Sequence, residues 1–374
     1  MNVQDGHIGV REWTALVLLA TGAKILNPSS VVLTQYGREA TWLLSVAAGA
    51  LNLLFVVLVI RFMRPHPGKG LLDVIEARSG RWLAKGFSLA LCAGMTANGF
   101  INLRLLVDQA KIVTLPQTPI SVMMICTLVL ALYLAYKGVE TLSRLSRVLL
   151  PWLFGAIVSV AVLMMNRYNF NLLAPWFGPG LPQVAWEGMR HALYYGEPFA
   201  MTALALFVRS QPEFERGVRR GAVYAIVAAT LVIIELQLIL GSPGSERVAF
   251  PYLELSRMIY LNRFIQHLEG IYSAIWLLIA FTQIAIDLYL ATFLFSQTFS
   301  MKRFRPLLLP MASLFMMFAL MPSYFYETIV WKDIYLIQLG GAVIYGGFLL
   351  AWLASLFRRG EDREGVLGGA AAGD

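Results

Sequence analysis

The stretch "ATGAKILNPSS" (residues 20–30) interrupts the first long apolar segment of the chain, which covers residues 11–35. It brings Gly22, Lys24 and Pro28 close together in the sequence. Proline removes a helix hydrogen bond and clashes with the preceding turn, and glycine tolerates unwound backbone. A charge inside hydrocarbon costs about 2.5–3.5 kcal/mol on insertion scales. The stretch therefore predicts an interrupted membrane helix that forms part of a site.

The composition places this interruption in a membrane protein. The 374 residues are 58% hydrophobic and 14% charged, whereas soluble proteins carry about 25% charged residues. Ten apolar segments are long enough to cross the hydrocarbon, which takes about 20 residues. They cover residues 11–35, 39–63, 81–107, 119–137, 144–165, 184–208, 218–240, 268–297, 304–322 and 333–357. We therefore expect an all-α membrane protein with ten transmembrane helices and no soluble domain.

The sixth segment carries a similar interruption, in which "YYGEPFAM" (residues 194–201) brings Gly196, Glu197 and Pro198 together. A long polar connection over residues 166–188 divides the ten segments into two groups of five. Paired interruptions in corresponding helices are typical of transporters built from inverted repeats, where they point to the binding site. The sequence thus predicts a 5+5 inverted repeat with discontinuous helices 1 and 6.

Two long connections support the repeat. They cover residues 64–80 and 241–270, and each follows the second segment of its half. We expect a short helix in each connection, on opposite sides of the membrane, as an inverted repeat requires.

The basic residues predict the orientation. Most of the 30 Lys and Arg residues fall on the side of the membrane that also holds both termini. Cytoplasmic loops carry such an excess, so both termini are expected to be cytoplasmic. The expected organisation is a cytoplasmic N-terminus at residues 1–10 and a transmembrane domain at 11–358, with repeats at 11–165 and 184–357. A flexible cytoplasmic tail follows at residues 359–374.

Three motifs carry a resemblance to a known family: "LPQTP" (115–119), "KGVETLSRLSRVLLP" (137–151) and "FPYLELSRMI" (250–259). With them, the chain resembles the spore germination permeases, which are the B subunits of endospore germinant receptors. That family lies within the amino acid–polyamine–organocation transporter superfamily, whose fold is LeuT-like. The resemblance covers residues 8–358. Lys24 and Glu197 depart from the usual family pattern, which has less charged residues at these places.

The resemblance implies a function, a location and partners. A member binds a small nutrient at mid-membrane to trigger spore germination, and for this chain we expect the nutrient to be an amino acid. It lies in the inner membrane of the spore, in contact with lipid and with A-type and C-type receptor subunits. The alternative is a secondary transporter of amino acids or polyamines that works by alternating access. The sequence shows no catalytic, metal-binding or phosphate-binding motif, so we expect neither an enzyme nor a cofactor, a metal or a nucleic-acid partner.

Lys24 and Glu197 are the main candidates for the site. In an inverted repeat they lie near each other at mid-membrane, where they pair with each other, contact the ligand, or do both. Backbone N–H groups around Gly22 and Ala23 suit the carboxylate of an amino acid. Carbonyl groups near Gly196, or Glu197 itself, suit its ammonium group. The ammonium of Lys24 can also replace a bound sodium ion, which predicts binding without sodium.

Other side chains are candidates because of their place in the third, sixth and eighth segments. They are Thr96, Asn98, Tyr195, Phe199, Thr282 and Gln283. A threonine hydroxyl can instead bond to its own helix backbone, and an aromatic ring can serve packing alone. Asp287, deep in the eighth segment, is either a pathway residue or a partner for a neighbouring helix. Arg104 is expected to extend to the external surface.

Overall fold

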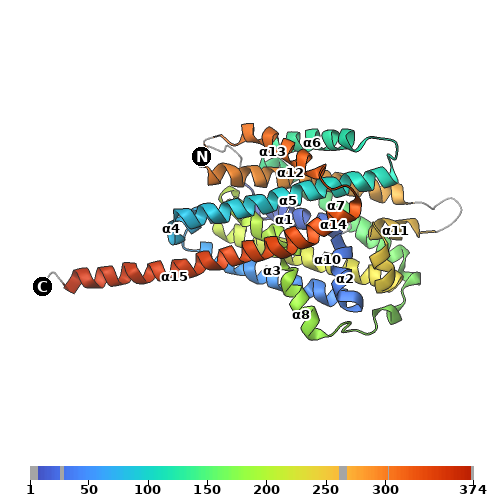
Figure 1. Ribbon diagram of the computed structural model, residues 1–374, viewed down its shortest axis with the longest axis horizontal. Helices are drawn as coiled ribbons and strands as arrows, with labels where there is room; N and C mark the ends of the chain where they lie inside the picture. The colour runs from blue at the N-terminus through green and yellow to red at the C-terminus, as the bar shows by residue number, and fades with distance from the viewer. Residues whose placement is uncertain (1–6, 26–28, 261–267, 302, 372–374) are drawn as a thin grey trace.

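The apolar segments form helices in the computed structural model, which describes residues 7–25, 29–260, 268–301 and 303–371. The first half contains α1 (Val10–Gly22), η1 (Ala23–Ile25), α2 (Ser29–Gly37), α3 (Thr41–Met63), α4 (Leu71–Ser79), α5 (Arg81–Val113), α6 (Ile120–Lys137) and α7 (Val139–Leu163). The second half contains α8 (Leu181–Arg190), η5 (Ala192–Tyr195), α9 (Glu197–Met201), η6 (Thr202–Phe207), α10 (Gln211–Arg247), α11 (Pro251–Arg257), α12 (Glu269–Thr298), α13 (Leu308–Ala319), α14 (Phe325–Val330), η8 (Trp331–Gly340) and α15 (Gly341–Ala371). Most of the long helices run along the long axis of the molecule (Figure 1).

Helices long enough for a membrane dominate the fold. Among the residues that the structure describes, seven helices are long and apolar enough to cross a bilayer, and Glu197–Phe207 and Arg305–Ala319 are shorter apolar helical segments. Large apolar side chains such as Leu54, Val129 and Leu350 are exposed on the outside of the bundle. A surface of this kind suits lipid rather than water. The prediction of a helical membrane protein is confirmed, whereas the count of ten spans and the inverted repeat stay predictions.

The core is built around α12 and α5. α12 lies against α5, α6 and α7, and it also contacts the first interruption at η1. α1 lies between α10 and α7, and it also contacts α9. The two interrupted segments therefore meet in the middle of the bundle, beside the two helices that carry the candidate polar residues.

Both long connections contain the short helix that the sequence predicts. Leu71–Ser79 forms α4 in the first connection, and Pro251–Arg257 forms α11 in the second. α4 contacts η6 and α15, and Ser79 Oγ donates to the carbonyl of Ala351 at 2.6 Å.

The motif that begins at Lys137 forms a tight helix–helix junction. Gly138 alone separates α6 from α7 and has a φ of +92°, which glycine adopts without the steric cost of a side chain. One turn later Arg144 pairs with Glu140 at 2.5 Å, and Arg147 pairs with Glu12 of α1 at 2.5 Å. The motif thus fixes the start of α7 against the start of α1.

The start of α1 and the later part of α15 lie at the same end of the bundle. Ile8 N donates to Phe207 O at 2.9 Å, and η6, which ends at Phe207, lies against α4. α4 in turn lies against α15, which projects beyond the other helices (Figure 1). This agrees with two termini on one side of a membrane. The helix α15 continues to Ala371, beyond the predicted end of the membrane domain at residue 358, and the flexibility of residues 359–374 stays a prediction.

Candidate functional site

The two interruptions form as the sequence predicts. α1 ends at Gly22 and passes into the 3-10 turn η1, while Asn27 and Pro28 lie outside the described residues. In the second half, η5 ends at Tyr195 and α9 begins at Glu197. Gly196 connects them, and a Cβ there would lie 2.5 Å from Leu193 Cδ1. A side chain at position 196 would therefore clash with the preceding turn.

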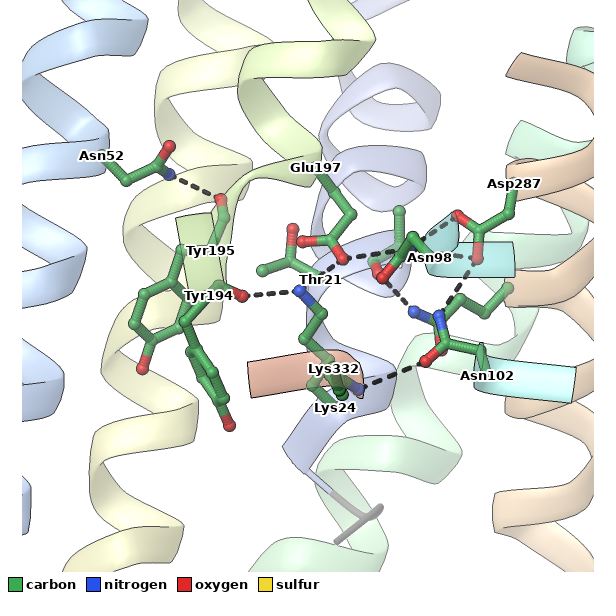
Figure 2. Close-up of polar contacts among 12 residues, drawn as sticks. Thr21, Lys24, Asn52, Asn98, Asn102, Tyr194, Tyr195, Glu197, Asp287 and Lys332 are labelled. Atoms are coloured by element: carbon green, nitrogen blue, oxygen red, sulfur yellow. Dashed lines mark hydrogen bonds and ion pairs between the residues drawn. The ribbon is translucent and has the colours of Figure 1, made fainter. Parts of the chain in front are cut away.

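A buried ion pair joins the two interruptions. Lys24 Nζ lies 2.5 Å from Glu197 Oε1 and also donates to the carbonyl of Tyr194 at 2.5 Å (Figure 2). The two side chains are only 5% and 3% exposed. Helical geometry leaves backbone carbonyl groups unbonded where a helix is interrupted, and here a lysine from the other interruption satisfies one of them.

Asparagines on α5 extend the ion pair into a polar chain. Asn98 Nδ2 donates to Glu197 Oε1 at 3.3 Å and to Asp287 Oδ1 at 3.1 Å. Asn102 Nδ2 donates to Asp287 Oδ2 at 3.1 Å, and Lys332 Nζ donates to Asn102 Oδ1 at 3.3 Å (Figure 2). Residues 98 and 102 share one face of α5 because side chains four positions apart on a helix are neighbours.

The charges of this polar chain cancel. Lys24 and Lys332 supply two positive groups, Glu197 and Asp287 supply two negative groups, and all four side chains are buried. Buried charges are stable only when they are paired and hydrogen-bonded. Within this polar chain, Glu197 Oε2 is the one carboxylate oxygen without a hydrogen-bond partner among the described residues. A buried carboxylate oxygen in this position can accept a hydrogen bond from a ligand or a water molecule.

A narrow cavity lies beside the polar chain. The space inside it that is free of atoms is about 420 Å³, part of which is open to the surroundings, and the space that a water molecule can occupy is about 30 Å³. Its polar lining comes from Lys24, Asn98, Glu197 and Lys332, and its apolar lining includes Met95, Phe199, Leu336 and Ile344. A few convergent polar groups in an otherwise apolar cavity are typical of small-molecule sites.

Five of the predicted ligand-binding residues line this cavity: Lys24, Asn98, Gly196, Glu197 and Phe199. Gly22 and Ala23 lie outside its lining, and Ala23 N donates to Leu19 O, so this N–H is bonded within its own helix. Asp287 also lies outside the lining and is a partner for α5 through the two asparagines.

The remaining candidates make other contacts. Thr96 Oγ1 donates to Cys92 O at 2.8 Å and Thr282 Oγ1 donates to Leu278 O at 2.9 Å, so both bond to their own helices. Gln283 Nε2 donates to Ala20 O at 3.1 Å and so links α12 to α1. The hydroxyl of Tyr195 lies 2.6 Å from Ser45 Oγ, outside the cavity.

Two residues of the polar chain were missed in the sequence. Lys332 lies one residue before the predicted tenth segment, and Asn102 was not singled out. Asn102 could have been found from its spacing, because it follows Asn98 by one helical turn. The prediction for Arg104 was wrong: its side chain is buried, pairs with Asp108 at 3.0 Å and donates to the carbonyl of Pro322 at 2.7 Å. Pairing within the protein replaces extension to the surface.

A second polar cluster, here called the Asp333 cluster, also went unpredicted. It consists of Tyr36, Glu187, Arg190, His191, Asp333 and Gln338. Asp333 Oδ2 accepts from the Tyr36 hydroxyl at 2.7 Å, and Asp333 Oδ1 lies 3.1 Å from His191 Nε2. The cluster joins α2, the end of α8 and η8, next to Lys332 in the sequence.

The backbone is similar to solved transporter structures. A Na+-coupled sialic acid symporter in a substrate-bound outward-open state gives a TM-score of 0.65 at 13% identity, covering 92% of this chain and 79% of that one. A nucleobase–cation symporter family transporter gives 0.56 at 13%, covering 91% and 78%. A manganese transporter from Eremococcus coleocola gives 0.55 at 13%, covering 96% and 80%. The chain therefore has the LeuT-like fold of membrane transporters.

The family follows from the sequence comparison. The model of a family described as spore germination protein matches residues 11–325. Spore germination protein A2 of Bacillus subtilis (strain 168) is 21% identical over 339 residues, which cover 90% of this chain and 92% of the relative. Spore germination protein KB of the same organism is 21% identical over 299 residues, which cover 77% of each. The chain is an integral membrane protein that belongs to the spore germination protein family, as the resemblance in its motifs predicts.

Proposed function

We propose that this protein is a germinant-receptor subunit that binds an amino acid at mid-membrane to trigger spore germination. The observation that carries the proposal is the buried pair of Lys24 and Glu197, which joins the two helix interruptions at the edge of a cavity. A ligand that enters this cavity contacts both halves of the chain at once. It can therefore shift the equilibrium between two arrangements of the halves, provided that it binds one arrangement better.

The charge balance of the site favours an amino acid over a polyamine. The charges of Lys24, Lys332, Glu197 and Asp287 already balance one another at the site. A zwitterion adds no net charge, whereas a polyamine brings several positive charges for which the site holds no matching excess of carboxylates. An uncompensated buried charge is strongly unfavourable.

The finer architecture belongs to the same proposal. Ten transmembrane helices would form a 5+5 inverted repeat over residues 11–358, with both termini in the cytoplasm and the protein in the inner membrane of the spore. A-type and C-type receptor subunits would be its partners, and the tail at residues 359–374 would be flexible. Two interruptions in contact and a short helix in each long connection support this arrangement.

An equilibrium-binding screen tests the proposed ligand. The purified full-length protein would be titrated with each standard amino acid and with spermidine as a polyamine probe. We expect saturable binding of at least one amino acid and none of spermidine. Glu197→Gln should weaken the binding by at least about tenfold, because the orphan carboxylate oxygen is then replaced by a neutral group. A screen in which no amino acid binds would overturn the proposal.

Uptake separates the sensor from the alternative transporter. Protein in sealed lipid vesicles would be given a radiolabelled amino acid that binds in the screen. A sensor binds the label without accumulating it, whereas an alternating-access transporter moves it into the vesicle. Accumulation that depends on Lys24 and Glu197 would show that the protein is a secondary transporter of amino acids and not a receptor subunit.

A further inference from the structure

In the Asp333 cluster, both ring nitrogens of His191 face hydrogen-bond acceptors. His191 Nδ1 lies 2.8 Å from the backbone carbonyl oxygen of Glu187, and His191 Nε2 lies 3.1 Å from Asp333 Oδ1. The side chain is completely buried. A neutral imidazole carries hydrogen on one nitrogen only, whereas an imidazolium carries it on both. The neutral ring would therefore leave the lone pair of one nitrogen opposite an acceptor oxygen.

The other contacts of Asp333 show where the hydrogen of this contact belongs. The Tyr36 hydroxyl donates to Asp333 Oδ2 at 2.7 Å, and Gln338 Nε2 donates to Asp333 Oδ1 at 3.0 Å. Both carboxyl oxygens thus act as acceptors, which is the pattern of an ionised carboxylate, since a protonated carboxyl group uses one oxygen as a donor. The hydrogen between Asp333 and His191 therefore belongs to Nε2 of the ring.

A proton on His191 also balances the charges of the cluster. Glu187 and Asp333 supply two negative charges, and Arg190 supplies one positive charge through its pair with Glu187 at 3.1 Å. The imidazolium of His191 supplies the second positive charge. Glu187, His191 and Asp333 are all buried, and a buried charge without a partner is strongly unfavourable.

The elements that pack around His191 contribute further ionisable side chains in the described part of the chain. They are Tyr36 on α2, Arg61 on α3, Tyr194 and Tyr195 on η5, and Lys332 and Tyr335 on η8. The Tyr36 ring centre lies 4.6 Å from that of His191. Arg61 lies near the end of α3, and Lys332 Nζ donates to Asn102 in the polar chain. Asp333 is thus the carboxylate that lies against Nε2.

The pair of His191 and Asp333 lies next to residues of the cavity wall. Leu193 follows His191 by two positions, Lys332 directly precedes Asp333, and both Leu193 and Lys332 line the cavity. The Tyr36 hydroxyl attaches α2, which follows the first interruption, to the same carboxylate. The pair therefore connects three segments beside the cavity.

We propose that His191 and Asp333 form a proton-binding site that latches α2, α8 and η8 together beside the cavity. When the pH rises, the Nε2–H bond breaks, its electron pair stays on Nε2 and the proton passes to water. A lone pair then faces a carboxylate oxygen, so the contact becomes repulsive and the latch opens. Arg190, whose side chain is 38% exposed, gives the cluster an edge at the surface for this exchange. The inference goes beyond the proposed function and does not depend on the identity of the ligand.

Nitrogen NMR tests whether His191 carries the proton. The purified full-length protein would be labelled with nitrogen-15 in its histidine rings, and the His191 signals would be identified by their loss in His191→Phe. We expect both ring nitrogens of His191 to carry hydrogen at about pH 8, where an imidazole in water is neutral. The exposed His7 supplies the reference signal for a ring in contact with water.

Two variants separate the proton from packing. Asp333→Asn removes the carboxylate opposite Nε2, so the His191 ring should become neutral at the same pH. Tyr36→Phe removes a hydrogen bond to the same carboxylate but keeps Asp333 Oδ1 opposite Nε2, so the ring should stay charged. A purely structural cluster would give the same ring signal in both variants. Because the wild type is measured first, its result stands even where Asp333→Asn does not fold.

Cysteine labelling tests the latch. A cysteine introduced as Ile337→Cys lines the cavity, and Cys126→Ser removes the exposed native cysteine. The labelling rate with His191→Phe, which binds no proton, would be divided at each pH by the rate with His191. This ratio cancels the pH dependence of the thiol itself. We expect a ratio of at least about threefold while the ring is charged, falling towards one as the ring loses its proton.

The outcomes are distinct. A His191 ring that is neutral at about pH 8 in the wild type overturns the proton site. A labelling ratio near one while the ring is charged, or a ratio that stays constant while the ring loses its proton, overturns the latch. A failure to bind any amino acid overturns the proposed function alone, because neither measurement uses a ligand.

Discussion

Lys24 Nζ lies 2.5 Å from Glu197 Oε1, so the two interruptions of the chain are joined by one buried ion pair. The partners come from different halves of the chain and are both almost inaccessible. This pair is also the reason why both interruptions tolerate a charge at membrane depth, since each residue neutralises the other.

Removing both partners of this pair should destabilise the protein less than the two single removals added together. Lys24→Met or Glu197→Gln alone should each cost about 3–5 kcal/mol of unfolding free energy, because the other charge loses its partner in a buried place. The double variant should cost clearly less than the sum of the two, since no unpaired charge remains. Thermal unfolding of the purified protein measures all three.

The exposed pair of Arg64 and Glu215 provides the matched control. Arg64 Nη2 lies 2.8 Å from Glu215 Oε2, but the Arg64 side chain is 61% exposed. Arg64→Ala should therefore cost no more than about 1 kcal/mol. Strictly additive effects of Lys24→Met and Glu197→Gln would contradict a direct pair.

Binding of an amino acid should not need sodium. The ammonium of Lys24 supplies a fixed positive charge at the first interruption, and Gln283 Nε2 donates to the carbonyl of Ala20 at 3.1 Å. These N–H donors occupy the carbonyl oxygens of Tyr194 and Ala20, which are therefore less available to a sodium ion. Titrations in sodium chloride and in choline chloride at equal ionic strength should give dissociation constants within about twofold. An affinity that rises steeply with sodium concentration would rule this out.

The helix interruptions could be predicted from the sequence, whereas the directions in which the side chains point could not. Glycine, proline and charge stand out in an apolar run, so the positions of Gly22, Lys24, Gly196 and Glu197 were predictable. Thr96 and Asn98 were equal candidates, although two residues differ by about 200° around a helix. Only Asn98 faces the cavity. When both faces of a helix are apolar, the sequence does not show which face is inside.

Lys332 illustrates a second limit. The sequence places it just outside the tenth apolar segment, where a lysine is expected to reach the membrane surface. The structure begins η8 at Trp331 and turns Lys332 into the core. That direction depends on the contacts of η8 with α5 and η5, which are distant in the sequence. The Asp333 cluster could not be predicted for the same reason, because its members come from elements that are distant in the sequence.

The Asp333 cluster should hold α2, α8 and η8 together beside Lys332, which lines the cavity. Asp333→Asn replaces the carboxylate that accepts from Tyr36, and breaking hydrogen bonds to a charged group typically costs about 1.5–3 kcal/mol. We expect lower thermal stability and faster labelling of a cysteine introduced as Ile337→Cys, which lines the cavity. The labelling would be done with Cys126→Ser, because Cys126 is exposed and Cys92 is buried.

Glu76→Gln is the control for this variant, because Glu76 is an exposed carboxylate on α4. It should change neither the stability nor the labelling rate. Unchanged labelling of the introduced cysteine in Asp333→Asn would show that the cluster does not restrict access to the cavity.

Close packing of α5 against α13 should depend on Gly99. A Cβ at this position would lie 2.0 Å from Phe315 Cε2, and Phe315 is completely buried. Small residues let membrane helices approach closely, and overpacking of such a contact costs about 1–3 kcal/mol. Gly99→Ala should therefore lower the thermal stability, whereas Gly86→Ala on the same helix meets nothing within 4 Å and should be neutral or slightly stabilising. Because Asn98 adjoins Gly99, a forced shift of α5 should also weaken amino acid binding in Gly99→Ala and not in Gly86→Ala. Equal stability of the two variants would mean that α5 and α13 are not in this contact.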